Sequence, residues 1–462
     1  MSREAALGIA EALFDSGAFQ DVLQRRIAMP TESRRPGREA ELRAYLTDEM
    51  TPSLEAVGFA TVLLEEPASP APYLFAERDE GAPLTVFVYA HGDVVNGQEG
   101  EWSNDLDPWT ITEVGERWYG RGVADNKGQH TVNFEALKAV IEARGRLGFN
   151  AKILVDMGEE VGSPGLRDLA LANRERFASD ILVASDGPRF AADKPTLFMG
   201  SRAAIDIIMT VAPRKGAHHS GNWGGLLSNP AVRLAHAIAA IVSPTGRIKV
   251  PGWTPDRIMP SIRHTLAGLE LAPGSNDPVI DPEWGEPGLT RVEQVYAWSS
   301  FEVLTFLTGD PASPQSAIPD VATARCQLRF TADIAPEDVV PALRRHLDAE
   351  GYEDVMLERG RQSLVRATRL DPDDPWVVRA AQSMERTLGF APVVLPNFGG
   401  TLPNDIFAED LGMKTLWVPH SYPGCSQHAI DEHVPRQIFA EGLRIMTGLY
   451  YDLGEASEAG AS

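Results

Sequence analysis

Short apolar runs that end in polar residues are the dominant pattern in the first half of the chain. Residues 86–90 run directly into His91-Gly92-Asp93, and residues 151–157 run into Gly158-Glu159-Glu160. A third run, 181–185, ends at Asp186. A short apolar run bounded by turn residues is typical of a buried strand. The pattern therefore predicts three buried strands whose carboxyl ends carry imidazole and carboxylate groups.

Helical periodicity surrounds these strands. Apolar positions spaced three and four residues apart predict helices, and Ser163 before Pro164 predicts a further helix start through a capping hydroxyl. Because strands and helices alternate, we expect an α/β sheet with its ligand site beyond the carboxyl ends of parallel strands. The predicted helices cover 5–14, 39–57, 129–143, 375–388 and 435–453, and further strands, the first two at sheet edges, cover 60–65, 73–76 and 415–418.

The pattern changes after residues 199–202 and predicts a second domain. Alternating residues over 204–211 suggest a half-exposed strand, and the mixture of strands and helices that follows is typical of an α+β domain. Residues 244–300 show no clear period and receive no assignment, and the tail 455–462 is predicted to be disordered. The predicted elements of this domain are helices over 227–242 and 336–350 and strands over 324–330 and 354–358.

Composition narrows the class of protein. The 462 residues are too many for one ordinary core, and 43% hydrophobic and 23% charged residues are typical of globular proteins. A net charge of −23 argues against a nucleic-acid surface. Two cysteines give no disulfide framework, residues 1–20 lack the features of a signal peptide, and no apolar run approaches membrane length. We expect a cytoplasmic protein without nucleic-acid or membrane partners.

A glycine-rich loop over 120–128 carries Asp125 at its centre. A loop of this kind before a helix can bind phosphate, but it is not a GxxxxGK[ST] motif and Asp125 would repel an anion. Glu159-Glu160 alone would be typical of a solvated surface pair, whereas its position at a strand end favours a site. With the late histidine His428, these groups form an oxygen and nitrogen ligand set that suits zinc, manganese or cobalt.

Taken together, these motifs resemble the M20 metallopeptidases, most closely the carnosinase-like dipeptidases. The resemblance rests on His91-Gly92-Asp93, the 120–128 loop, Glu159-Glu160, Asp186, His219-Ser220-Gly221 and His428 with Glu432. It implies an α/β, two-domain fold: a catalytic zinc-peptidase-like α/β domain with an inserted α+β domain that acts as a lid and mediates dimerisation. The implied boundaries are 1–198 and 369–462 for the catalytic domain and 199–368 for the lid.

The resemblance also implies a centre of two divalent metal ions, zinc in the first instance, with manganese and cobalt as alternatives. Asp125 would bridge the two ions. His91 and Asp186 would complete one site, and Glu160 and His428 the other. Asp93 would orient His91, Glu159 would be the general base, and the Asp125–Asn126 peptide bond would be cis.

In the lid, the resemblance assigns His219 to the reacting carbonyl across a homodimer interface and Arg329 to the substrate carboxylate. The late loop that would carry Gly400 and Thr401 to the substrate departs from the family. Asn397 stands where the family's dipeptidases have a carboxylate-binding arginine, and an amide brings neither charge nor a bidentate fork.

Three functions therefore stay open. The first is hydrolysis of dipeptides, and the second is hydrolysis of N-acyl amino acids or other small amides. The third is a non-catalytic binding protein of the same fold, which the complete ligand set and Glu159 disfavour. No GxSxG or HExxH motif offers a competing chemistry.

Overall fold

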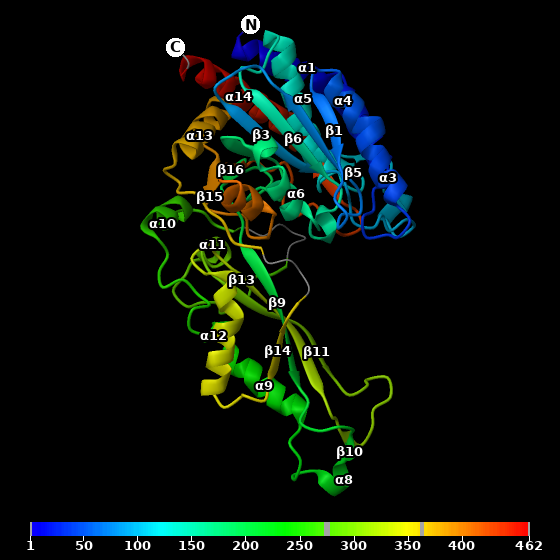
Figure 1. Ribbon diagram of the computed structural model, residues 1–462, viewed down its shortest axis with the longest axis vertical. Helices are drawn as coiled ribbons and strands as arrows, with labels where there is room; N and C mark the ends of the chain where they lie inside the picture. The colour runs from blue at the N-terminus through cyan, green and yellow to red at the C-terminus, as the bar shows by residue number, and fades with distance from the viewer. Residues whose placement is uncertain (1, 272–277, 361–364, 461–462) are drawn as a thin grey trace. The chain divides into compact units, whose positions relative to one another are not determined.

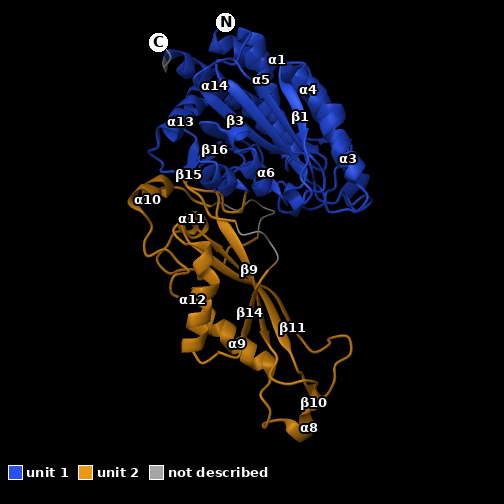
Figure 2. Cartoon of the chain, viewed as in Figure 1, with its two compact units in different colours: residues 1–200, 370–395, 403–462 blue, residues 201–369, 396–402 orange. Residues whose placement is uncertain are grey.

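The computed structural model describes residues 2–271, 278–360 and 365–460. The chain forms two compact units, shown in different colours in Figure 2. Unit 1 comprises Met1–Gly200, Leu370–Leu395 and Pro403–Ser462, and unit 2 comprises Ser201–Arg369 and Pro396–Leu402. The predicted α/β fold with an inserted α+β domain is confirmed.

Unit 1 is built on a mixed sheet of eight strands among its described residues, in the order β1-β2-β6-β3-β7-β16-β8-β15. The central strands β6, β3, β7 and β16 are parallel, so their carboxyl ends lie at one edge. Their residues are almost entirely buried, as expected for a sheet covered on both faces. The strands are β1 (Ala60–Leu64), β2 (Tyr73–Arg78), β3 (Thr85–His91), β6 (Asn150–Asp156), β7 (Ile181–Ala184), β8 (Thr196–Phe198), β15 (Val393–Leu395) and β16 (Lys414–Trp417).

Helices α1, α2 and α14 pack against α5, which is buried along most of its length. Helices α1, α5 and α14 contact one another, and α13 packs on α14 (Figure 1). The helices are α1 (Arg3–Asp15), α2 (Ala18–Ile27), α3 (Glu39–Ala44), α4 (Thr51–Glu55), α5 (Lys127–Arg144), α6 (Leu166–Ala172), α7 (Arg174–Phe177), α13 (Pro375–Leu388) and α14 (Arg436–Gly460). Shorter elements are the π-helical η1 (Tyr45–Met50) and η4 (Ile406–Asp410), the 3-10 turns η2 (Ser103–Asp105) and η3 (Glu159–Val161), and a small sheet of β4 (Thr112–Val114), β5 (Arg117–Tyr119) and β17 (His433–Pro435).

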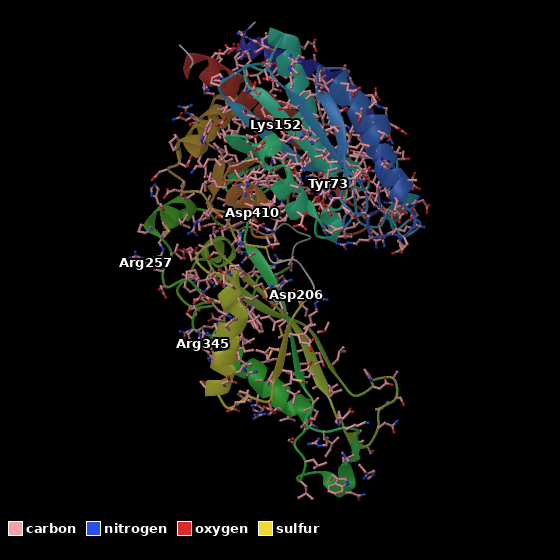
Figure 3. The ribbon with its side chains drawn as sticks, viewed as in Figure 1. Tyr73, Lys152, Asp206, Arg257, Arg345 and Asp410 are labelled. Atoms are coloured by element: carbon pink, nitrogen blue, oxygen red, sulfur yellow. The ribbon has the colours of Figure 1, made fainter. Side chains whose placement is uncertain are left out.

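Unit 2 is an antiparallel sheet in the order β11-β13-β9-β14, and helices α9 and α12 pack on it. Polar pairs tie its strands together: Asp206 on β9, labelled in Figure 3, accepts hydrogen bonds from Arg325 and Gln327 on β13. The strands are β9 (Ala203–Val211), β10 (His218–His219), β11 (Ser300–Thr308), β12 (Ala317–Ile318), β13 (Ala322–Phe330) and β14 (Met356–Arg359). The helices are α8 (Ser220–Trp223), α9 (Pro230–Ile241), α10 (Pro260–Leu266), α11 (Arg291–Tyr296) and α12 (Pro336–Ala349).

Several local predictions are wrong. Ser163 does not cap a helix, because its hydroxyl donates to Asp156 and α6 begins only after Gly165. Strand β2 lies inside the sheet rather than at its edge. Residues 455–460 continue α14 instead of being disordered, with Glu458 paired to Arg144. Residues 461–462 lie outside the described residues, as do 272–277 within the unassigned segment that contains α10 and α11.

No helix in the described part of the chain combines the length and the apolar character needed to cross a membrane.

Candidate metal centre

The turn after β3 brings His91 and Asp93 to the carboxyl edge of the sheet. His91 is the last residue of β3, and the Gly92 N–H donates to the Asp156 carbonyl of β6 at 2.8 Å. A Cβ on Gly92 would lie 2.5 Å from the Tyr45 ring and 2.9 Å from Met157 Sδ. Only glycine therefore fits between the two carboxyl-end residues, and both side chains are fully buried.

Two groups of ligand atoms meet at this edge. His91, Asp125 and Asp186 form one, and Asp125, Glu160 and His428 form the other, with all atoms of each group within 4.8 Å of one another. His91 Nε2 lies 3.0 Å from Asp125 Oδ1 and 3.5 Å from Asp186 Oδ2. His428 Nε2 lies 2.9 Å from Asp125 Oδ2 and 3.2 Å from Glu160 Oε2. Asp125 thus turns one oxygen toward each group.

Glu432 organises the loop that presents Asp125. Its buried carboxylate accepts backbone hydrogen bonds from Gly122, Ala124 and Asp125 at 2.8–3.1 Å, and Arg121 Nη1 donates to it at 2.8 Å. The Asp125–Asn126 peptide bond is cis, as the resemblance implies. The contacts of Glu432 hold this loop in place.

Asp93 connects the two strand ends. Its backbone carbonyl oxygen lies 3.1 Å from His91 Nδ1 and its Oδ1 lies 3.3 Å from the same atom, so the imidazole can donate to Asp93 and keep Nε2 available as a ligand. Its two oxygens also accept the backbone N–H groups of Glu159 and Glu160, at 3.2 and 3.1 Å. Asp93 thereby orients His91 and holds the turn η3.

The site concentrates negative charge in a buried place. Burial raises the pKa of Glu160 to about 7 and raises that of Glu159 well above its ordinary range. For Asp125, burial acts in the same direction but is outweighed by hydrogen bonds with His428 and His91, which lower its pKa. Hydrogen bonds with Asp125 and Glu160 raise the pKa of His428 to about 10. Carboxylates this close can all ionise only when cations lie among them.

The donor set fits divalent metal ions. Glu160 Oε1 is buried and has no hydrogen-bond partner in the described part of the chain, which is costly unless another group binds it. The converging atoms are carboxylate oxygens and imidazole nitrogens, the ligands that zinc and manganese accept. Two groups that share Asp125 can hold two cations.

The other predicted residues belong to unit 2. His219 lies on β10 with an exposed side chain, and its Nδ1 accepts the Gly221 N–H. Arg329 on β13 donates to Thr401 Oγ1 at 3.3 Å. Asn397 donates to the Phe398 carbonyl, and a Cβ at Gly400 would collide with the Phe398 ring. Within unit 2, Arg329 and the 396–402 loop therefore lie side by side.

Three residues at the centre were missed or left without a role. Gln427 donates to Asp125 Oδ2, Arg34 contacts the Glu160 carbonyl, and Glu432 supports the loop. Of these three, only Glu432 could be recognised in the sequence, because it belongs to the motifs on which the family resemblance rests. Gln427 and Arg34 stand in irregular segments whose contacts arise from folding.

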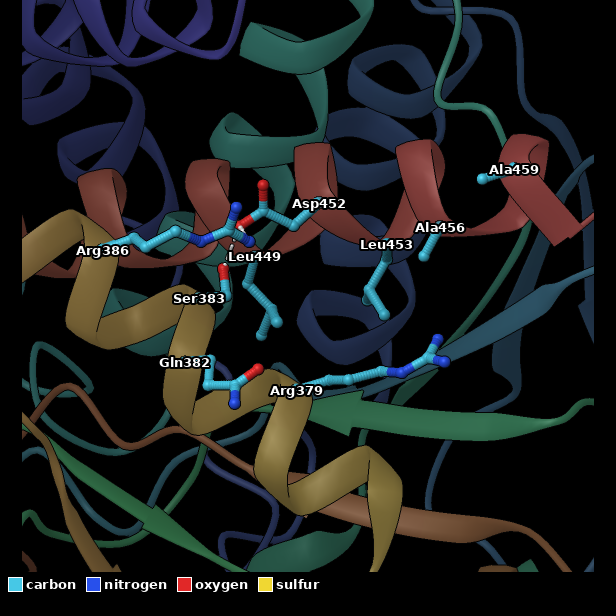
Figure 4. A pocket seen from close by; sticks show the side chains of 9 residues that line it. All are labelled: Arg379, Gln382, Ser383, Arg386, Leu449, Asp452, Leu453, Ala456 and Ala459. Carbon is cyan, nitrogen blue, oxygen red and sulfur yellow. Dashed lines mark hydrogen bonds and ion pairs between the residues drawn. The ribbon is translucent and has the colours of Figure 1, made fainter.

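A separate cavity of about 450 Å³ lies between α13 and α14 (Figure 4). Its lining includes Arg379, Gln382 and Leu453 and none of the ligand residues. Its one carboxylate, Asp452, is already paired with Arg3 and Arg386. The cavity therefore has no part in the candidate centre.

Comparison with known proteins agrees with the geometry. The chain is 26% identical over 371 residues to the cysteinylglycine-S-conjugate dipeptidase of Corynebacterium striatum. This alignment covers 77% of this chain and 78% of that protein. It is 25% identical over 412 residues to the Beta-Ala-His dipeptidase of Rattus norvegicus, covering 83% of this chain and 80% of that protein. The fold matches the crystal structure of human carnosine dipeptidase 1 with a TM-score of 0.79 and 21% identity, over 98% of this chain and 99% of that one.

The profile of peptidase family M20/M25/M40 matches residues 87–452, which include all five candidate ligands and both glutamates of η3. The predicted resemblance is thereby confirmed, and the chain belongs to peptidase family M20/M25/M40.

Proposed function

We propose that this protein is a dinuclear metal-dependent hydrolase that cleaves the amide bond of dipeptides or similar small substrates. The observation that carries the proposal is the pair of ligand groups sharing Asp125, with Glu159 beside them but in neither group. The names of its relatives, a cysteinylglycine-S-conjugate dipeptidase and a Beta-Ala-His dipeptidase, support a dipeptide substrate.

In this proposal, Asp125, His91 and Asp186 would hold one divalent ion, and Asp125, Glu160 and His428 would hold a second. Zinc is the first candidate, and manganese and cobalt are the alternatives. Asp93 holds His91 through its Nδ1–H and fixes the ring's orientation. Buried free thiols at Cys326 and Cys425 fit a reducing compartment, so a cytoplasmic location stays part of the proposal.

Two bound divalent cations supply Lewis acidity, which lowers the pKa of a water molecule and polarises the scissile carbonyl. Glu159 then acts as general base: its carboxylate takes a proton from the attacking water and passes it to the nitrogen of the leaving amine. Its backbone N–H donates to Asp93, so the residue keeps its place while its carboxylate gains and loses a proton. The water oxygen forms a bond to the acyl carbon, the C–N bond breaks, and the amine leaves neutral with the proton from Glu159.

We infer a homodimer through unit 2. Strand β11 is an edge strand, and Leu304 and Leu307 on it are 51% and 64% exposed. Val303 and Phe306 on the same strand are also exposed. An exposed apolar edge is a liability unless another chain covers it. In this dimer, His219 of one chain serves the metal centre of its partner and donates a hydrogen bond to the carbonyl oxygen as it becomes negative.

Asn397 favours a second candidate substrate class. Arg329 supplies a positive charge beside the 396–402 loop, but Asn397 adds none. Arg202 adds a second guanidinium at this loop, where it donates to the Gly399 carbonyl, but a third at position 397 would bind a carboxylate more strongly. N-acyl amino acids and other small amides are therefore the alternative to free dipeptides.

The test is a product-release assay over dipeptides, N-acyl amino acids and simple amides, with Zn²⁺, Mn²⁺ or Co²⁺ added to metal-free protein. We expect turnover of at least one class that requires the metal and is absent from the Glu159→Gln protein. Failure of every substrate with every metal would contradict the proposal, and the ranking of dipeptides against N-acyl amino acids decides between the two substrate classes.

A further inference from the structure

The guanidinium of Arg34, in the segment between α2 and α3, binds the turn η3, which carries both Glu159 and Glu160. Arg34 donates to the Glu160 carbonyl oxygen through Nε at 2.8 Å and through Nη2 at 2.7 Å. The same Nη2 lies 3.7 Å from Glu160 Oε2. Two parallel N–H groups on one oxygen fix the direction of the carbonyl better than a single donor.

The segment that carries Arg34 is itself anchored next to β3. Thr31 Oγ1 donates to the Gly92 carbonyl at 2.6 Å, and Val94 N–H donates to the Thr31 carbonyl at 2.8 Å. Glu32 is buried and accepts from the Gly97 N–H at 2.9 Å. Arg34 therefore projects from a base that is joined to the His91-Gly92-Asp93 turn.

Contacts from outside add to the backbone hydrogen bonds that close the turn η3. It is only three residues long and has no side-chain cap. Asp93 accepts the N–H groups of Glu159 and Glu160 on one side, and Arg34 donates to the Glu160 carbonyl on the other. Both backbone ends of Glu160 are thus held, while its carboxylate is left for a ligand.

We propose that Arg34 is a positioning residue of the metal centre, which fixes the Glu159–Glu160 turn through a two-pronged contact with the Glu160 carbonyl. This inference rests on the proposed ligand role of Glu160. It has two physical parts: the fork orients Glu160, and the positive charge lies beside a group of carboxylates. A lysine keeps the charge but cannot reproduce the planar fork, so the two parts can be separated.

Arg35 offers a matched control. It follows Arg34 directly, its side chain is 49% exposed against 50% for Arg34, and it pairs with Glu32 and Glu99 instead of with η3. Replacing it removes the same charge from the same segment without touching the Glu160 carbonyl. The variants are Arg34→Met, Arg34→Lys and Arg35→Met, each compared with the unaltered protein.

The main measurement is Zn²⁺ affinity without substrate, by competition with a chelator of known affinity. Loss of a supporting contact typically weakens metal binding by about 10–100-fold. We expect a loss of that size for the weaker-binding Zn²⁺ in Arg34→Met, a smaller loss in Arg34→Lys, and a change below about 2-fold in Arg35→Met. Thermal melting of the metal-free proteins should be alike for Arg34→Met and Arg35→Met, because the contact acts on the centre rather than on the core.

The outcomes separate cleanly. Unchanged Zn²⁺ affinity in Arg34→Met overturns the inference, and equal losses in Arg34→Met and Arg35→Met show a general effect of charge. Full affinity in Arg34→Lys overturns the role of the fork. If Arg34→Met does not fold, Arg34→Lys against Arg35→Met still decides. Should the unaltered protein bind no Zn²⁺, Mn²⁺ or Co²⁺, the proposed function fails before the variants are compared.

Discussion

Glu159 and Glu160 are neighbours in η3, yet their surroundings differ. Glu160 belongs to a ligand group with Asp125 and His428, and its side chain is 1% exposed. Glu159 belongs to neither ligand group and is partly exposed. The proposal therefore gives the same residue type two separable roles, one in binding metal and one in moving a proton.

We predict that Glu159→Gln removes turnover but keeps the metal, and that Glu160→Gln loses metal. The amide of glutamine cannot accept the proton from water, and loss of a general base costs about 10²–10⁴-fold in rate. Metal analysis and kcat of the two purified variants check this. A metal-free Glu159→Gln protein beside a metal-loaded Glu160→Gln protein would show that the roles are reversed.

We predict that Asn397→Arg shifts the substrate preference toward free dipeptides. The substitution adds a further guanidinium to those of Arg329 and Arg202 at this loop, which strengthens binding of a terminal carboxylate. The measurement is the ratio of kcat/KM for matched substrates with a free and with an amidated carboxyl terminus. An unchanged ratio would mean that residue 397 does not contact this part of the substrate.

At this scale, the sequence predicts residues that stand at strand ends and misses those that meet the site through irregular segments. His91, Glu160 and Asp186 follow apolar runs, so the sheet alone brings them together. Arg34 and Gln427 have no such position, and their contacts depend on how loops fold back. Ligand types are therefore visible in the sequence, whereas supporting residues in irregular segments, such as Arg34 and Gln427, are not.

The elements of the sheet follow from hydrophobic pattern wherever burial enforces it. Strands β3, β6 and β7 are buried and match the predicted runs closely. No prediction covered β11, an apolar edge strand whose side chains are mostly exposed, nor the short helix α2. Apolar and polar residues alternate only weakly along an edge strand, because neither face needs to be fully buried. The exposed apolar residues of β11 instead indicate a surface that another chain covers.

The loop after β16 carries a buried histidine that makes stability depend on pH. His420 is fully buried beside Gly442 of α14, and burial, with nearby Arg189, holds its pKa well below 6.5. Below pH 6.5, the unfolded chain therefore binds a proton at His420 that the folded chain does not bind. Its contribution is fully present above pH 6.5 and is lost as the pH falls below that value, by up to about 1.4 kcal/mol per pH unit.

We predict that His420→Leu flattens this acid dependence. Between pH 7 and pH 5, the urea midpoint of metal-free protein should fall less in His420→Leu than in the unaltered protein. His236→Leu, at an exposed position on α9, is the control and should behave like the unaltered protein. Equal falls in all three proteins would contradict the neutral state of buried His420.

For the whole molecule, the proposed homodimer makes each metal centre depend on two chains. Unit 1 holds every candidate ligand, while His219 stands on β10 in unit 2. If His219 acts in the site of a partner chain, activity depends on assembly as well as on the residues of one chain. This dependence can be tested by mixing two inactive proteins.

We predict that His219→Ala lowers kcat, by roughly 10²–10³-fold for a lost oxyanion donor, with its metal intact. Mixing it with Glu159→Gln should restore part of the activity, because one of the two sites in a hybrid dimer has both residues. Tagging one partner verifies that subunits exchange. Verified hybrids without recovered activity would show that His219 does not act across an interface.

The central claim is that two metal ions held by five side chains make this protein a hydrolase. Elemental analysis of the active protein, repeated after chelation and after titration of metal back to the chain, tests it most directly. The account predicts two divalent ions per chain, activity lost when they are removed, and activity regained as they return. Full activity in protein that contains no metal would contradict it.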